Sequence, residues 1–106
     1  MANNRYERGA TLERTVAADW RKLGYVTARC AGSHGAFDVI AVRPGDLILA
    51  QCKSGGKYAF AGFGPASRER LALEAAQAGG RAVLVFKGTR QRGYDVIGME
   101  EWPNAS

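Results

Sequence analysis

Hydrophobic residues recur at helical spacing near the start of the chain. Between about residues 8 and 23 they follow one another at steps of three or four positions, as Leu12, Val16, Trp20 and Leu23. This is the period of one face of an α-helix. Gly24 comes directly after that face and is typical of a helix end. The pattern therefore predicts a first helix over residues 8–23.

Short apolar runs separated by turn residues follow this helix. They predict strands over residues 25–30, 36–42 and 47–53, the last two joined by a Pro-Gly turn at 43–46. Strands connected so briefly are expected to form an antiparallel meander. A second helix should open at Pro65 and run to about Ala78. Two further strands are predicted over residues 82–86 and 94–97.

A segment rich in glycine and aromatic residues lies between the third strand and the second helix. It spans residues 54–65 and carries Tyr58, Phe60 and Phe63. One interpretation is a mobile loop or irregular edge strand whose aromatic rings contact a partner subunit or distorted DNA. In the other interpretation the rings cover the protein's own core. The loop between the last two strands carries Lys87, Arg90 and Arg92, which either form a solvated tip or grip phosphate.

Polar residues interrupt these apolar patterns at three places. Glu13 lies three residues before Val16, along the edge of the helical stripe, where a carboxylate is costly unless it is paired or binds metal. The alternative is a glutamate at the margin of the stripe, paired with an arginine in solvent. Asp38 interrupts the apolar row of the second strand. Alternation places Gln51 and Lys53 on one face of the third strand, and Asp38 can meet Gln51 across the hairpin.

The composition narrows the class of partner. The chain has 106 residues, enough for a single domain over 1–106, and a net charge of +5. A basic balance favours an anionic partner, with nucleic acid first, although a generic soluble surface explains the charge equally well. No apolar run is long enough to span a membrane. Cys30 and Cys52 lie in apolar strand patterns, where reduced cysteine acts as a small hydrophobe, so we expect a reducing, cytoplasmic location without disulfides.

These pieces, in this order, resemble the PD-(D/E)xK nucleases, and more narrowly the archaeal-type Holliday junction resolvases. The similarity covers most of the chain, and the residues that carry it are Arg8-Gly9, Glu13-Arg14, Gly24-Tyr25-Val26, Ala31-Gly32-Ser33, Asp38-Val39-Ile40-Ala41, Gln51-Cys52-Lys53 and the strand from Gly80 to Val85. The resemblance implies an α/β fold, a restriction-endonuclease-like mixed β-sheet flanked by helices in the order α-β-β-β-α-β-β. It also implies a metal-dependent, structure-selective DNA endonuclease that resolves four-way junctions by paired phosphodiester hydrolysis, acting as a homodimer on branched DNA.

The resemblance assigns roles to individual residues. Glu13, Asp38 and Gln51 would hold Mg²⁺ or Mn²⁺, while Lys53 would orient the attacking water or stabilise charge on the phosphoryl oxygens. Ser33 would be a loop serine needed for cleavage. The candidate DNA-binding residues are Arg8, Arg14, Arg29, His34 and Lys57. His34 has no certain counterpart in the family, and an incidental loop histidine is the alternative.

Gln51 departs from the family pattern, which usually has glutamate there. An amide oxygen can still ligate a hard cation, but one negative charge is lost, and weaker metal affinity is the expected consequence. Two other functions therefore stay open. One is a nuclease of the same fold that acts on nicked, flapped or linear DNA. The other is a DNA-structure-binding protein whose catalysis has weakened.

Overall fold

The computed structural model describes residues 4–30, 36–56, 59–60 and 62–103, with side chains from Ala10 onward. In chain order the elements are helix α1 (Asn4–Lys22), strands β1 (Val26–Arg29), β2 (Val39–Arg43) and β3 (Asp46–Gly55), helix α2 (Pro65–Gln77), strands β4 (Arg81–Gly88) and β5 (Asp95–Gly98), and the 3₁₀ turn η1 (Met99–Glu101). This order confirms the predicted one. Helix α1 begins four residues earlier than the apolar period indicated, because polar residues can extend a helix without contributing to its buried face.

The strands form one five-stranded sheet in the order β1-β2-β3-β4-β5. The first three are antiparallel to one another, as the meander prediction had it. Strand β4 then pairs in parallel with β3, and β5 returns antiparallel. A parallel neighbour needs a crossover connection, and α2 supplies it between β3 and β4. The result is the mixed sheet that the sequence predicted.

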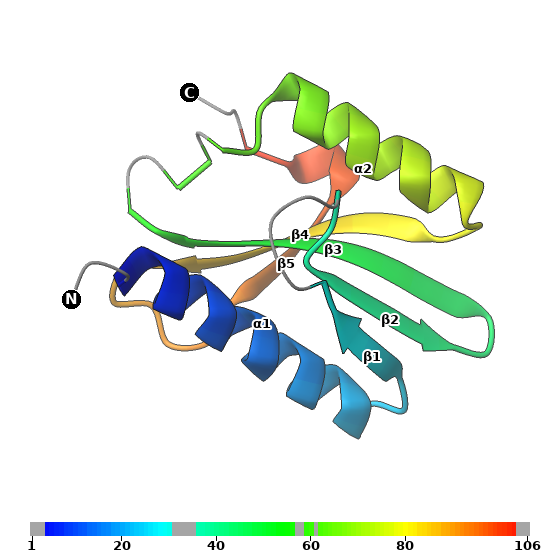
Figure 1. Ribbon diagram of the computed structural model, residues 1–106, viewed down its shortest axis with the longest axis horizontal. Helices are drawn as coiled ribbons and strands as arrows, with labels where there is room; N and C mark the ends of the chain where they lie inside the picture. The colour runs from blue at the N-terminus through cyan, green and yellow to red at the C-terminus, as the bar shows by residue number, and fades with distance from the viewer. Residues whose placement is uncertain (1–3, 31–35, 57–58, 61, 104–106) are drawn as a thin grey trace.

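The two helices cover opposite faces of the sheet (Figure 1). The alternation of β3 separates the two cores: Ile48, Ala50 and Cys52 pack with α1, whereas Leu49 packs with α2. Cys52 is therefore buried on the α1 side, opposite Gln51 and Lys53. The predicted division of the Gln51-Cys52-Lys53 tripeptide between two faces is confirmed.

The start of β4 lies unusually close to β3. A Cβ atom at Gly80 would stand 2.3 Å from Leu47 Cδ2 and 2.6 Å from the Leu47 carbonyl oxygen. The backbone oxygen of Leu47 cannot rotate away as a side chain can. A residue larger than glycine at position 80 would therefore push the start of β4 away from β3. Gly80 thus permits α2 to turn directly into β4.

The described aromatic rings of the segment before α2 belong to the protein's own core. Phe63 is fully buried, and its ring centroid lies 5.1 Å from that of Trp102 in an edge-on arrangement. Phe60 packs on Phe86 with centroids 4.7 Å apart. Tyr58 lies outside the described residues. The interpretation that these rings cover the protein's own core is therefore confirmed for Phe63, whereas Phe60 is only partly buried.

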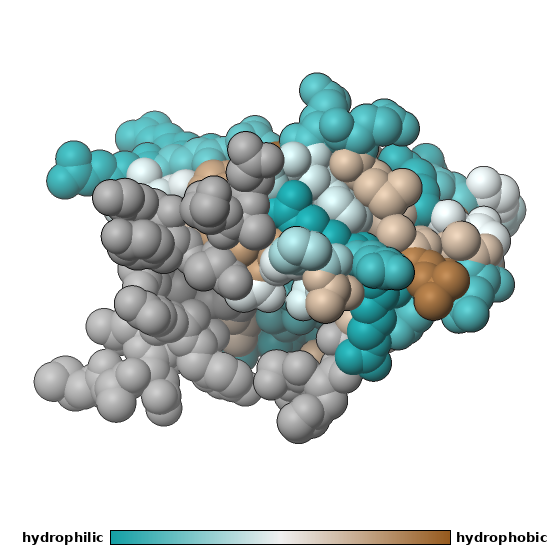
Figure 2. Space-filling view, turned by 90° about the horizontal axis from the view of Figure 1, so that it is seen from above, coloured by the Kyte–Doolittle hydropathy of each residue, from teal (hydrophilic) through white to brown (hydrophobic). Residues whose placement is uncertain are grey.

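The surface shows no continuous apolar face in the view over α2. There, away from the grey atoms, apolar side chains form small areas among hydrophilic ones (Figure 2). Among the residues whose side chains are described, the large apolar ones that are exposed are Leu23, Val26, Val42, Leu73, Val96 and Met99. Within the described part of the chain, neither helix is long and apolar enough to cross a membrane.

Candidate metal and DNA-binding site

Asp38 is the residue just before β2 and lies beside the part of β3 that extends past the end of β2. The pairing of β2 with β3 stops at Val39 and Ala50, so the rest of β3 has a strand neighbour, β4, on one side alone. The Asp38 amide donates to the Ala50 carbonyl at 2.8 Å, and Asp38 Oδ2 accepts from the Cys52 amide at 2.8 Å. The carboxylate thus occupies the place of a further strand residue. This explains why β2 begins at Val39 and not, as expected, at Ala36.

The same carboxylate oxygen meets Gln51. Gln51 Nε2 donates to Asp38 Oδ2 at 2.8 Å, so the predicted meeting of these two side chains across the hairpin is confirmed. The carbonyl oxygen and the NH₂ group of an amide are similar in shape, but one accepts hydrogen bonds and the other donates them. Turned about its last bond, Gln51 would present an oxygen to the place its nitrogen now faces.

Glu13 reaches this place from α1. It lies three residues before Val16 and four before Ala17, which are 0% and 2% exposed, so its side chain faces the sheet. Arg29 of β1 donates from Nε and Nη2 to Glu13 Oε1, both at 3.3 Å. The Glu13 side chain is 18% exposed. Glu13 therefore pairs with an arginine, as one sequence interpretation had it, but in a half-buried position and not in open solvent.

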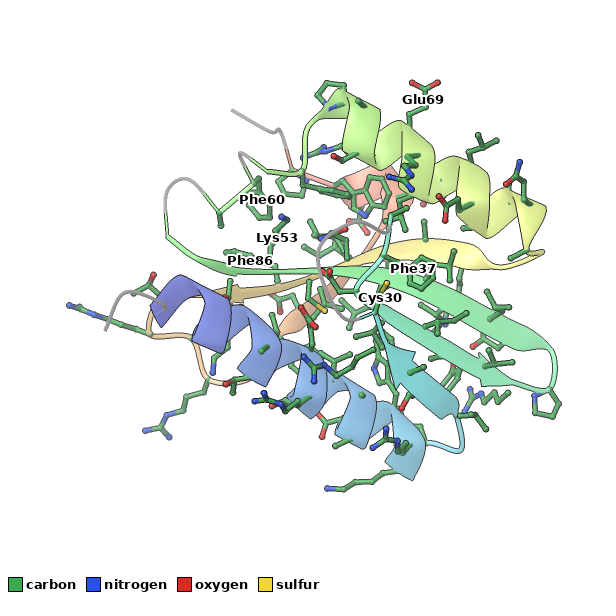
Figure 3. All side chains as sticks on the ribbon, viewed as in Figure 1. Cys30, Phe37, Lys53, Phe60, Glu69 and Phe86 are labelled. Carbon is green, nitrogen blue, oxygen red and sulfur yellow. The ribbon has the colours of Figure 1, made fainter. Side chains whose placement is uncertain are left out.

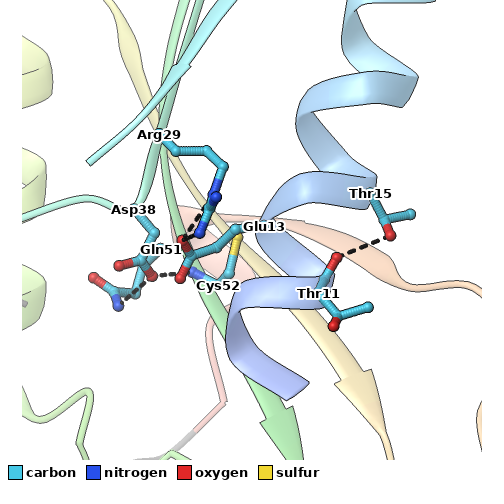
Figure 4. A network of polar contacts seen from close by, with 7 residues as sticks. All are labelled: Thr11, Glu13, Thr15, Arg29, Asp38, Gln51 and Cys52. Atoms are coloured by element: carbon cyan, nitrogen blue, oxygen red, sulfur yellow. Dashed lines mark hydrogen bonds and ion pairs between the residues drawn. The ribbon is translucent and has the colours of Figure 1, made fainter. Parts of the chain in front are cut away.

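Figure 4 shows the carboxylates of Glu13 and Asp38 pointing toward one another beside β3, with Arg29 on the outer side. Burial raises the pKa of Glu13, and the negative charge of Asp38 raises it further, against the opposing effects of Arg29 and Arg14. The carboxylate thus has less compensating positive charge than its burial requires. A cation placed between the two carboxylates would remove the repulsion.

The pKa of Asp38 is raised as well. Burial is the main cause, and the hydrogen bond from the Cys52 amide and the charges of Lys53 and Arg29 oppose it. Asp38 accepts two hydrogen bonds on Oδ2, and no partner among the described side chains is recorded for its other oxygen. Such a half-buried oxygen fits a hard divalent cation, which prefers carboxylate and amide oxygens.

The donor set contains two acids and one amide. Among the described residues, no group of three or more histidine, cysteine, aspartate and glutamate side chains gathers closely enough to hold a metal ion. Glu13 and Asp38 supply the acids, and the third predicted ligand is the neutral Gln51. The residues therefore fit a divalent cation held with one negative charge fewer than three carboxylates would give.

Lys53 lies two residues beyond Gln51 on the face of β3 that looks toward α2. Its backbone pairs with that of Phe86, and Figure 3 shows its side chain beside Phe60 and Phe86. A Cβ atom at Gly62 would stand 3.1 Å from Lys53 Nζ. Gly62 thus leaves room for the ammonium group, a contribution that the sequence pattern did not reveal.

The remaining predicted site residues divide into two sets. Arg14 is exposed on α1, next to Glu13, and is free to meet a phosphate. Arg29, expected to bind DNA, forms the ion pair with Glu13. Outside the described part of the structure lie the side chain of Arg8 and the residues Ser33, His34 and Lys57.

The chain as a whole is similar to known proteins. Residues 4–102 match the model of the archaeal Holliday junction resolvase (Hjc) family. The crossover junction endodeoxyribonuclease Hjc of Methanocaldococcus jannaschii is 35% identical over 57 residues, which cover 54% of this chain and 42% of that protein. The chain thus spans less than half the length of this relative.

The fold matches a solved structure. The Holliday junction resolvase Hjc of Archaeoglobus fulgidus superposes with a TM-score of 0.68 over 88% of this chain and 74% of that chain, at 17% sequence identity. That likeness confirms the restriction-endonuclease-like fold. Because the family model spans all the described elements from α1 to η1, the chain belongs to the archaeal Holliday junction resolvase family.

Proposed function

We propose that this chain is a metal-dependent endonuclease that cuts branched DNA, with the four-way junction as its substrate. The observation that carries the proposal is that Asp38, just before β2, accepts a hydrogen bond from Gln51 of β3 and lies close enough to Glu13 of α1 to raise the pKa of that carboxyl. Membership of the resolvase family supports it. So does the net charge of +5, which favours a polyanionic partner.

The cation of this proposal is Mg²⁺ or Mn²⁺, held by Glu13, Asp38 and Gln51. When bound, such an ion lowers the pKa of a coordinated water and balances the charge of the phosphoryl oxygens. Arg29 would then share Glu13 with the cation, so the ion pair seen in the structure would weaken as the site fills. Gln51 would turn its amide oxygen inward.

Lys53 is placed to act on the phosphate. Its ammonium group stands on the α2 side of β3, and its charge lowers the pKa of Asp38, so the two groups lie within electrostatic reach. There Lys53 would orient the attacking water or stabilise charge on the phosphoryl oxygens. Ser33 remains the proposed loop serine, and Arg8, Arg14, His34 and Lys57 the proposed contacts to the DNA backbone.

The assembly we propose is a homodimer. A four-way junction has two equivalent strands to cut, and a two-fold dimer offers two symmetric sites. Because Phe63 is fully buried, its ring would not form the dimer surface. We also propose a cytoplasmic location, because an enzyme that cleaves DNA must meet it there.

Cleavage of a synthetic four-way junction tests the proposal. In Mg²⁺ we expect paired nicks in opposing strands near the branch point, and Asp38→Asn should abolish them. Asparagine keeps an oxygen that can accept from the Cys52 amide, so junction binding in Ca²⁺ should stay within a few-fold of wild type. Nicks scattered along the arms, or equal competition by linear duplex, would favour a general nuclease. Junction binding without cleavage in any metal would favour a structure-binding protein.

A further inference from the structure

A cavity opens on the flank of α1 that faces away from Glu13. Its volume is about 720 Å³, and it lies between α1, the end of β3 and the β4–β5 loop. Figure 4 shows Thr11 and Thr15 on this flank, pointing away from the side chain of Glu13. The cavity is therefore separate from the carboxylates, with the helix between them. Its lining includes Thr11, Ser54, Lys87, Thr89, Arg90 and Tyr94.

The lining has a consistent chemistry. Hydroxyl groups come from α1, β3 and the β4–β5 loop, positive charges come from Lys87 and Arg90, and none of the lining residues is acidic. Among the described residues, neither cation takes part in an ion pair. At the rim, Tyr94 donates its hydroxyl to Asp19 Oδ2 at 2.8 Å. Hydroxyl donors combined with unpaired cations suit a phosphate group.

Two hydrogen bonds hold the backbone of the loop that carries Arg90. Gln91 Oε1 accepts from the Gly88 amide at 2.7 Å, and the Gln91 amide donates to the Gly88 carbonyl at 3.1 Å. Between them Arg90 adopts a left-handed backbone with φ of 68°, a conformation that a residue with a side chain rarely takes. A glycine there would be free of this strain. The sequence nevertheless places an arginine at the cavity wall.

We propose that this cavity is a second phosphate-binding site, which seats a backbone phosphate of the DNA away from the point of cleavage. Arg90 and Lys87 supply the charge, and the hydroxyls of Thr11, Ser54 and Thr89 supply further hydrogen bonds. Ser54 follows Lys53 directly along β3, so one strand connects the two places. The assignment to DNA rests on the proposed nuclease function, whereas the affinity for phosphate does not.

The test compares charge removal inside and outside the cavity. Lys87→Gln and Arg90→Gly remove cations of the lining, and Arg92→Gln removes one from the same loop that is exposed and does not line the cavity. Binding of a four-way junction is measured in Ca²⁺ over a range of salt concentrations. Each cavity variant should weaken binding by about five- to ten-fold at low salt and reduce the slope of log K against log salt by about 1. Arg92→Gln should change affinity by less than two-fold.

Arg90→Gly separates binding from folding. Because glycine relieves the left-handed backbone, the melting temperature should stay the same or rise while DNA affinity falls. A lower melting temperature together with the lost affinity would mean that Arg90 acts through the loop structure, and would overturn the proposal. An affinity loss for Arg92→Gln equal to that for Lys87→Gln would also overturn it, since charge anywhere on the loop would then suffice.

Titration with inorganic phosphate, followed by the amide resonances of Gly88 and Thr89, tests the site without DNA. Saturable shifts that vanish in Lys87→Gln support a phosphate site even if no junction is cleaved. Shifts of this kind with unchanged DNA affinity in all three variants would assign the cavity to a free phosphate compound and overturn the assignment to DNA. No shifts and no change in DNA affinity would overturn both.

Discussion

Replacing Gln51 with glutamate should make the stability of this protein depend on a divalent cation. In the structure Gln51 Nε2 donates to Asp38 Oδ2 at 2.8 Å, beside Glu13, and the pKa values of both carboxyls are raised. Glutamate removes the donor and adds a third negative charge at the same place. Without metal the change is unfavourable. With metal it restores an anionic ligand.

The magnitude follows from the lost hydrogen bond and the added repulsion. A hydrogen bond to a charged group contributes about 1.5–3 kcal/mol. Two unit charges about 4 Å apart repel by ~1 kcal/mol in water and by ~4 kcal/mol at an effective dielectric constant of about 20. Because Gln51 is half-exposed, the new carboxylate can rotate partly into solvent, which favours the lower part of these ranges. We expect a loss of about 2–4 kcal/mol, or roughly 8 °C or more in melting temperature for a domain of this size.

Melting curves in EDTA and in millimolar Mg²⁺ measure both effects. In EDTA, Gln51→Glu should melt well below wild type, and Mg²⁺ should raise its melting temperature more than that of wild type. In cleavage assays the Mg²⁺ concentration for half-maximal activity should fall about ten-fold, which corresponds to about 1.4 kcal/mol. Gln77→Glu is the control, because it makes the same substitution at the exposed last residue of α2.

Two results would refute this reasoning. If Gln51→Glu melts like wild type in EDTA, the hydrogen bond to Asp38 does not form in solution. If its melting temperature falls in EDTA but Mg²⁺ does not restore it, Gln51 does not face the cation. An equal fall in Gln77→Glu would point instead to the change in net charge.

Three further predictions concern stability. Phe63→Ala should destabilise the protein by about 3–5 kcal/mol, because the ring is fully buried, and chemical denaturation would measure the loss. Gly80→Ala should lower the melting temperature through its clash with the Leu47 carbonyl, whereas Gly98→Ala, whose Cβ would meet no atom within 4 Å, should not. Without metal, the two site carboxyls have raised pKa values in the folded state, so their contribution to stability is largest below their ordinary values of about 4 and is lost as pH rises through the raised ones. Melting temperatures in EDTA across this range should show that slope, and Asp38→Asn should reduce it.

The order of the elements could be predicted because the residues that recur at the apolar period are the ones that the fold buries. Leu12, Val16 and Trp20 all lie in the core that α1 forms with the sheet. The first residue of a strand was less predictable where a side chain, and not a backbone carbonyl, accepts the hydrogen bond from the neighbouring strand. The β2 strand starts at Val39 because the Asp38 carboxylate, and not another backbone group, meets the Cys52 amide.

The proximity of three candidate site residues was predictable from the sequence, but their other contacts were not. Glu13, Asp38 and Gln51 do come together, because their spacing fixes which faces they occupy. Nothing in the pattern shows that Arg29 pairs with Glu13, since that contact joins residues 16 positions apart in sequence. The role of Gly62 next to Lys53 is hidden for the same reason. Contacts between separate elements, or between a strand and a loop, leave no periodic signal.

The bond between the Cys52 amide and Asp38 gives the site a built-in spectroscopic reporter. That amide lies beyond the last pair of β2 and β3 and donates to a carboxylate that the cation would also engage. Whatever draws the Asp38 oxygen away leaves the Cys52 hydrogen with a weaker acceptor, which changes its chemical shift and its rate of exchange with solvent. The backbone of β3 can therefore register events at the site without an added label, and Asp38→Asn calibrates the signal.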